Sequence, residues 1–180
     1  WYSGVLAAPT AQLKHWLAKL QNNNSQKEYY LTDIVKMAVH DGTGCVAVKT
    51  TDGVQVAGVN SPVQLQELER QYQKRQAYAL MEQGVRLMDA ARFDLRGVLQ
   101  CGQDVSIDVG CVFEGTVVLG DDVQIGAHCH IANATIARGA VIHPFTHIDG
   151  EKLGVSVGAG ALVGPFARLR PGAQLDEEVH

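Results

Sequence analysis

The segment Ile107–Leu175 decides the fold, and it reads IDVGCVFEGTVVLGDDVQIGAHCHIANATIARGAVIHPFTHIDGEKLGVSVGAGALVGPFARLRPGAQL. An apolar residue recurs every sixth position, with two shifts of register, at Ile107, Phe113, Leu119, Ile125, Ile131, Ile136, Ile142, Ile148, Val157, Val163, Leu169 and Leu175. A six-residue repeat is typical of a parallel β-helix, whose short strands bury their apolar side only by stacking coils about 4.8 Å apart. An ordinary sheet alternates with period two instead. The segment therefore predicts a β-helix with these residues inside.

We call these repeating apolar residues markers. A second inward position is expected two residues before each marker, where the side chains are small or β-branched: Val105, Cys111, Val117, Val123 and Cys129. The chain has four cysteines and none of the CxxC spacing that metal and redox sites use. Their predicted places are strands and coil interiors. We therefore expect reduced, buried cysteines rather than disulfides.

Composition excludes several classes of protein. The 180 residues could form one domain or two small ones. They are 46% hydrophobic and 19% charged, and the formal net charge of −4 argues against nucleic acid as a partner. No apolar run approaches the roughly 18 residues of a membrane span, and no signal peptide opens the chain. These features predict a cytoplasmic protein that binds neither nucleic acid nor a membrane.

Residues 1–60 are α/β in pattern but too few for a complete α/β domain. The chain opens with a predicted strand, Trp1–Leu6, followed by a helix with the apolar stripe Leu13, Trp16, Leu17 and Leu20. Thr32 is a candidate N-cap for a second helix, which Asp41 and Gly42 end. Cys45–Lys49 and Val54–Val56 are predicted to form a β-hairpin around Thr51–Gly53.

A long helix is predicted next, in a linker arm over residues 61–90. Ser61 to Gln64 form a capping box with proline at the first helical position. The apolar stripe Leu65, Leu68, Tyr72 and Leu80 continues to about Gln83. About 22 residues rising 1.5 Å each give an arm roughly 33 Å long. The polar side chains on its other faces predict a solvated helix that joins two bodies.

Four strings, in this order along the chain, resemble the bacterial bifunctional GlmU family. They are Asn22–Asn24 with Glu28–Asp33, then Gly58–Asn60, then Arg92–Gly97, and finally Gly164–Gly172. The resemblance covers essentially the whole chain and corresponds to a central fragment of such an enzyme. It implies the C-terminal part of a uridylyltransferase domain in residues 1–60. It also implies the N-terminal part of a left-handed β-helix acetyltransferase domain in residues 91–180.

The resemblance also implies binding residues in the first segment. Asn60 matches the family's ligand for Mg²⁺ and UDP-N-acetylglucosamine, and an amide oxygen is a suitable hard ligand. Tyr30 and Thr32 match the region that holds the sugar-phosphate end of the nucleotide sugar. Tyr2 stands where family members commonly have an asparagine that contacts the N-acetylglucosamine.

In the β-helix, Arg170 matches the arginine that binds the sugar phosphate of the acetyltransferase site. An arginine fork suits a phosphate dianion better than a lysine does. Arg168 is the second choice, and both residues flank the inward Leu169, so both should point outward. The family implies a homotrimer as well.

The implied reactions are acetylation of glucosamine-1-phosphate by acetyl-CoA and uridylyl transfer from UTP to N-acetylglucosamine-1-phosphate with Mg²⁺. The family's glycine-rich phosphate loop, metal-binding aspartate and catalytic histidine and lysine have no match here. We therefore expect the chain alone to catalyse neither reaction.

Two alternatives stay open. One is a zinc enzyme like the γ-class carbonic anhydrases, using the outward His128, His130 and His147. The other is a non-catalytic trimerisation module.

Overall fold

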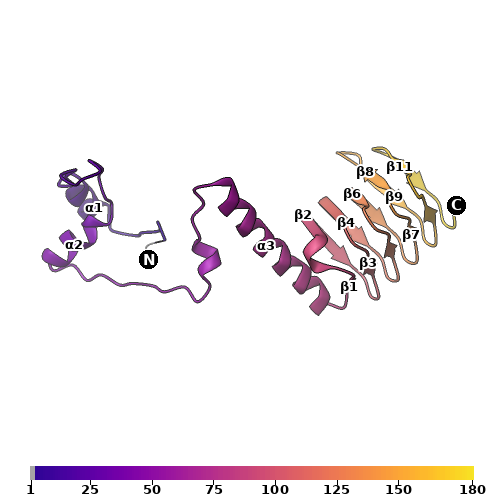
Figure 1. Ribbon diagram of the computed structural model, residues 1–180, viewed down its shortest axis with the longest axis horizontal. Coiled ribbons are helices and arrows are strands. Elements are labelled where there is room, and N and C mark those ends of the chain that lie inside the picture. The colour runs from indigo at the N-terminus through magenta and orange to yellow at the C-terminus, as the bar shows by residue number, and fades with distance from the viewer. Residues whose placement is uncertain (1–2) are drawn as a thin grey trace. The chain divides into compact units, whose positions relative to one another are not determined.

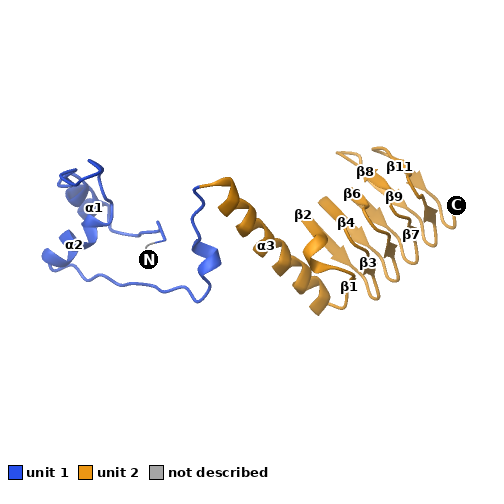
Figure 2. Cartoon of the chain, in the orientation of Figure 1, with its two compact units in different colours: residues 1–60 blue, residues 61–180 orange. Residues whose placement is uncertain are grey.

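The computed structural model describes residues 3–180, which divide into two compact units, residues 3–60 and residues 61–180 (Figure 2). The boundary follows Asn60, which is the last residue of the first predicted segment. The second unit contains a long helix and a parallel β-helix (Figure 1). No helix in residues 3–180 is long and apolar enough to cross a membrane.

The first unit contains two short helices and one 3-10 helix: α1 (Thr10–Leu17), α2 (Asp33–His40) and η1 (Gly53–Val56). Trp16, Ile34 and Ala38 form its small buried cluster. The indole N–H of Trp16 donates to a carboxylate oxygen of Asp41 over 2.9 Å, which fixes the end of α2 against α1. That hydrogen bond is the main reason that the pKa of Asp41 is lowered.

The predicted β-hairpin is wrong. Residues 43–50 have no regular structure, and Gly53–Val56 is a 3-10 helix, which the Asp52 side chain begins by accepting from the N–H of Val54. Val46 and Val48 are 89% and 92% exposed. A strand needs a neighbouring strand to satisfy its backbone groups, and the described part of this unit offers none. For the same reason the described part of the predicted first strand, from Ser3 onward, is not a strand.

Helix α3 (Pro62–Glu82) begins as predicted. The Ser61 hydroxyl accepts from the N–H of Gln64 over 3.2 Å, and Pro62 occupies the first helical position. The predicted solvated arm is wrong for the C-terminal half of the helix, because Gln73, Ala77 and Leu80 are buried against the β-helix. Leu65 and Tyr72 of the predicted stripe are exposed. The buried face is instead set by the edge of the β-helix.

The β-helix starts before residue 91, within the predicted linker range, because β1 (Arg86–Leu87) already pairs with β3 (Ser106–Ile107). A five-stranded parallel sheet joins these to β5 (Gln124–Ile125), β7 (Val141–Ile142) and β10 (Leu162–Val163). A seven-stranded parallel sheet has the order β11-β8-β6-β4-β2, with β9 (Val155–Val157) and β12 (Gln174–Leu175) beside that path. The members of that order are β2 (Phe93–Cys101), β4 (Cys111–Leu119), β6 (His130–Ile136), β8 (His147–Asp149) and β11 (Arg168–Leu169).

The inward positions are those that the six-residue repeat predicts. The markers from Ile107 to Val163 are at most 3% exposed, and Leu169 and Leu175 are partly buried. The second inward position is confirmed as well, with Val105, Cys111, Val117, Val123 and Cys129 at most 1% exposed. All four cysteines are free, but Cys45 is exposed and Cys101 only partly buried, so burial is confirmed for Cys111 and Cys129 alone.

Candidate functional site

The expected binding residues of the first unit that the structure describes lie in two segments of the chain. Tyr30 and Thr32 precede α2, where the Tyr30 hydroxyl is hydrogen-bonded to Gln26. Thr32 is not the expected side-chain cap of α2, because its backbone is already helical and its hydroxyl makes no capping hydrogen bond. Asn60 is exposed and directly precedes the cap of α3, beyond the irregular segment 43–52. Tyr2 lies outside the described residues.

The face around Arg170 is built from outward side chains of the seven-stranded sheet. Because its strands are parallel and in register, side chains of successive coils form columns. His130, His147 and Arg168 occupy one such column. Arg96 and Glu114 share the neighbouring column, in which Arg170 immediately follows β11.

Charge pairing differs along this face. Near its start, Arg96 donates to Glu114 over 2.8 Å, and the Nε2 atom of His130 lies 3.5 Å from the other oxygen of Glu114. At the other end Arg168 and Arg170 are exposed, as predicted, and no hydrogen bond or ion pair holds either guanidinium within residues 3–180. Two guanidinium groups without internal partners are suited to bind an anion.

The backbone beside Arg170 is fixed. The Arg170 carbonyl accepts from the N–H of Ala173 over 3.0 Å, and the N–H of Gly172 donates to Gly154 over 2.8 Å. Gly154 closes a loop over residues 150–154 whose tip carries the 77% exposed Leu153. The Arg170 side chain therefore projects from a rigid turn next to this loop.

The histidines are arranged as stacks. The rings of His130 and His147 lie 4.8 Å apart and nearly parallel, as the sequence predicts for adjacent coils. His128 stacks on Phe145 instead, over 5.3 Å, and Phe145 stacks on Phe166 over 5.2 Å. Within residues 3–180 no group of three or more His, Cys, Asp or Glu side chains could hold a metal ion. The structure therefore brings together two of the three histidines of the zinc alternative.

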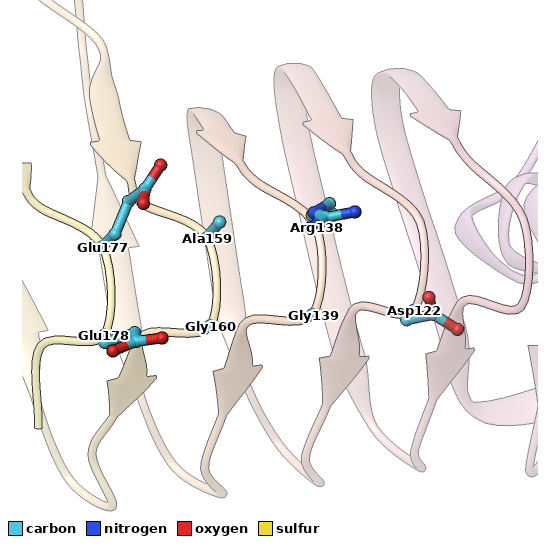
Figure 3. A pocket seen from close by; sticks show the side chains of 7 residues that line it. All are labelled: Asp122, Arg138, Gly139, Ala159, Gly160, Glu177 and Glu178. Atoms are coloured by element: carbon cyan, nitrogen blue, oxygen red, sulfur yellow. The ribbon is translucent and has the colours of Figure 1, made fainter.

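Sequence reasoning missed two features that depend on stacked coils. One is the aromatic stack of His128, Phe145 and Phe166, which a comparison of turn residues from coil to coil could have found. The other is a concavity of about 330 Å³ at a corner of the β-helix (Figure 3), lined by Asp122, Arg138, Gly139, Ala159, Gly160, Glu177 and Glu178. Gly139, Ala159 and Gly160 add little side-chain volume on the two middle coils, so that Arg138 is the one large side chain there that lines the concavity. No expected binding residue within residues 3–180 lines it.

Comparison with known proteins identifies relatives along the whole chain. Residues 116–150 match the family model described as bacterial transferase hexapeptide (six repeats). This match and the parallel sheets fit a left-handed β-helix. Over 99% of its length the chain is 73% identical to the bifunctional protein GlmU of Polaromonas sp. strain JS666. It is 71% identical to that of Polaromonas naphthalenivorans and 54% identical to that of Janthinobacterium sp. strain Marseille, each again over 99% of the chain. The resemblance to GlmU is confirmed, although the chain spans only 37–38% of the length of these relatives.

Proposed function

We propose that the chain serves in a bifunctional transferase that makes UDP-N-acetylglucosamine. Residues 1–60 would complete a uridylyltransferase domain, residues 61–90 would link it to the second domain, and residues 91–180 would begin an acetyltransferase β-helix. The observation that carries the proposal is the 73% identity to a GlmU protein over 99% of the chain. The hexapeptide match within the observed β-helix supports the acyltransferase half.

In the acetyltransferase half, the proposed role of Arg170 is to hold the phosphate of glucosamine-1-phosphate while its amine receives the acetyl group of acetyl-CoA. The exposed guanidinium can donate two parallel N–H bonds to phosphate oxygens. Because no carboxylate within residues 3–180 occupies it, none of these has to be displaced when the substrate binds. Arg168 contributes a second positive charge, because only the inward-pointing Leu169 separates it from Arg170 in the sequence.

In the uridylyltransferase half, the phosphate of N-acetylglucosamine-1-phosphate attacks the α-phosphorus of UTP and pyrophosphate leaves. Asn60 fits Mg²⁺ as one neutral oxygen ligand. The other ligands would be substrate phosphates and residues outside the described chain, since no acidic metal cluster occurs within it. When bound, Mg²⁺ neutralises charge that develops on the phosphates. Tyr30, Thr32 and Tyr2 are proposed to contact the sugar end.

Two substitutions in a complete GlmU relative test the assignment. Asn60→Ala removes a metal and nucleotide-sugar ligand, so uridylyl transfer should fall while acetyl transfer stays near normal. Arg170→Ala removes a charged hydrogen bond that typically contributes about 1.5–3 kcal/mol, so acetyl transfer should fall roughly tenfold to a hundredfold. Pyrophosphate release measures the first reaction, and release of the free thiol of CoA measures the second.

Arg168→Ala is the matched control, because it removes a guanidinium from the same strand end. It should change acetyl transfer less than Arg170→Ala does. The assignment is wrong if either substitution lowers both activities equally in a variant whose oligomer has the same number of chains as the wild type. An unchanged acetyl transfer in Arg170→Ala, with a loss in Arg168→Ala, would transfer the phosphate-binding role to Arg168.

A further inference from the structure

Cys111 and Cys129 occupy the same inward position on adjacent coils of the β-helix. They are eighteen residues apart in the sequence, and the N–H of Val112 donates to the Cys129 carbonyl over 3.0 Å, which places the two backbones side by side. The residues that follow them, Val112 and His130, are paired in the register of β4 with β6. Both cysteines are free and 1% exposed. The coil period therefore brings together two thiols that no short motif joins in the sequence.

Each of these thiols points toward the following coil. The Cys111 thiol donates over 3.2 Å to the carbonyl of Gly126, which lies on the coil of Cys129. The Cys129 thiol donates over 3.2 Å to the carbonyl of His143, one coil further on. The two cysteine side chains are also hydrogen-bonded to each other. The Cys111 sulfur therefore faces the Cys129 sulfur across the gap between two coils.

The spacing of the coils favours a metal ion between the sulfur atoms over a disulfide. Stacked parallel strands lie about 4.8 Å apart, whereas a disulfide draws the two Cβ atoms to about 3.8 Å. A thiolate–metal bond is about 2.3 Å long, so a metal ion in a straight line between two sulfur atoms holds them about 4.6 Å apart. Such a bridge fits coils at their ordinary separation. It needs only two ligands, whereas the search of residues 3–180 that found no metal cluster concerned groups of three or more.

We propose that Cys111 and Cys129 bind one two-coordinate soft metal ion, for which the mercuric ion is the best fit. Soft cations prefer thiolate ligands. Hg²⁺ displaces the protons of both thiols: two S–H bonds break, two Hg–S bonds form, and two protons pass to solvent without any transfer of electrons. The product is neutral, and an apolar interior accepts a neutral group at less cost than a charged one. A monovalent ion such as Cu⁺ would leave a net negative charge between the coils.

The surroundings of Cys129 help the first proton to leave. The hydrogen bond from the Cys111 thiol, together with the backbone N–H groups of Thr146 and Phe145, lowers the pKa of Cys129. Because both thiols are buried, the coils must open at this corner before an ion can enter. Uptake should therefore be slow compared with the reaction of the exposed Cys45.

The test uses the full chain with Cys45→Ser, which removes the exposed thiol, and adds one further substitution at a time. Cys111→Val and Cys129→Val each remove one proposed ligand, and valine already fills the equivalent inward position before other markers. Cys111→Ser keeps a hydroxyl that can donate to the Gly126 carbonyl. Cys101→Val is the matched control, because it removes a partly buried thiol that packs against the same core.

Each variant is incubated with one equivalent of mercuric chloride until uptake ends and is then dialysed against an excess of a small monothiol. Native mass spectrometry counts the retained ions, and X-ray absorption gives the number of sulfur ligands. We expect one Hg²⁺ with two sulfur ligands in the Cys45→Ser chain and in Cys101→Val. Removal of Cys111 or Cys129 should weaken retention roughly a hundredfold to ten-thousandfold, because the chain then no longer supplies two linked ligands.

Retention of the ion by Cys111→Val, Cys111→Ser or Cys129→Val as strongly as by Cys101→Val would overturn the proposal. Absence of uptake by the folded Cys45→Ser chain would overturn it as well. So would uptake that abolishes the β-type circular dichroism spectrum, because the proposed site belongs to stacked coils. Cys111→Ser keeps the test decisive if Cys111→Val does not fold.

Discussion

Individual residues of the β-helix core combine packing with specific polar contacts. The thiols of Cys111 and Cys129 donate to the carbonyls of Gly126 and His143, each over 3.2 Å. The hydrogen bond with Cys129, followed by burial, raises the pKa of Cys111. Burial raises the pKa of the Cys101 thiol to about 11. The Cys101 and Cys111 thiols therefore stay protonated near neutral pH, whereas the hydrogen bond with Cys111 lowers the pKa of Cys129.

Alkylation should distinguish the four thiols. At about pH 8, near the usual thiol pKa, iodoacetamide should label Cys45 first because it is exposed. Labelling of Cys101 should increase as the pH rises toward 11, since the raised pKa leaves little thiolate below that value. Peptide mass spectrometry after timed labelling of the folded chain measures each site. Rapid labelling of Cys111 or Cys129 in the folded protein would contradict the burial argument.

At the scale of elements, the first slip in the six-residue repeat has a local cause. The pairing of β4 with β6 shifts between Glu114 and Val117, so that Gly115 and Thr116 face the single residue Asn133. The Asn133 side chain compensates by accepting from the N–H of Thr116 over 3.1 Å. One coil therefore loses a residue while its markers remain inside.

The corner at Gly97 illustrates how tightly adjacent coils approach. It has a φ of 154°, and a Cβ atom placed there would lie 2.0 Å from the Gly115 carbonyl oxygen of the next coil. Gly139 has a φ of 69° and nothing within 4 Å of such an atom. A comparison of the two glycines therefore distinguishes the cost of a close backbone contact from the cost of an unfavourable backbone conformation.

Alanine substitutions at these two glycines should differ in cost. Gly97→Ala forces one coil away from the next and should lower the free energy of unfolding by about 2–4 kcal/mol. Gly139→Ala meets only the unfavourable conformation, which costs roughly 1–2 kcal/mol. Urea unfolding followed by circular dichroism measures both values. Equal losses would show that the close approach at Gly97 does not determine its stability.

On the scale of the whole molecule, the two units differ in how much core they bury. The second unit has one continuous cluster that runs from Ala77 to Val163. Among residues 3–60, the fully buried cluster consists of Trp16, Ile34 and Ala38 alone. A cluster of that size can offset little of the conformational entropy of ordering sixty residues.

Separate expression should reveal this difference. Residues 61–180 should unfold cooperatively with a β-type circular dichroism spectrum, whereas residues 1–60 alone should show no cooperative transition. Limited proteolysis of the full chain should cut first within residues 43–52, which lack regular structure. A first cut inside the β-helix would contradict this ranking.

Assembly is the second prediction for the whole molecule. We expect the chain to form a homotrimer, because the flat outer faces of the parallel sheets can pack around a threefold axis, as in the family that it resembles. Light scattering at a chain concentration of roughly tens of micromolar should give three times the chain mass of 19.4 kDa. A monodisperse monomer would contradict the expectation.

The amino-acid sequence was enough to predict the β-helix, because one inward apolar side chain recurs every six residues and this spacing is visible without knowledge of any contact. It also determined the start of α3, where Ser61 and Pro62 act on their own backbone, and the outward direction of Arg168 and Arg170, which follows from the inward Leu169 between them.

Features that depend on a partner distant in the chain could not be predicted and are visible only in the folded molecule. The buried face of α3 could not be predicted because it contains the polar Gln73. Burial of Gln73 is favourable only where the backbone of Leu95 offers its amide two hydrogen bonds. The predicted hairpin of residues 45–56 does not form, because here the distant partner is missing. Its valines alternate as in a strand, but no neighbouring strand lies within the described chain to pair with them, and an unpaired strand has no stabilising ladder.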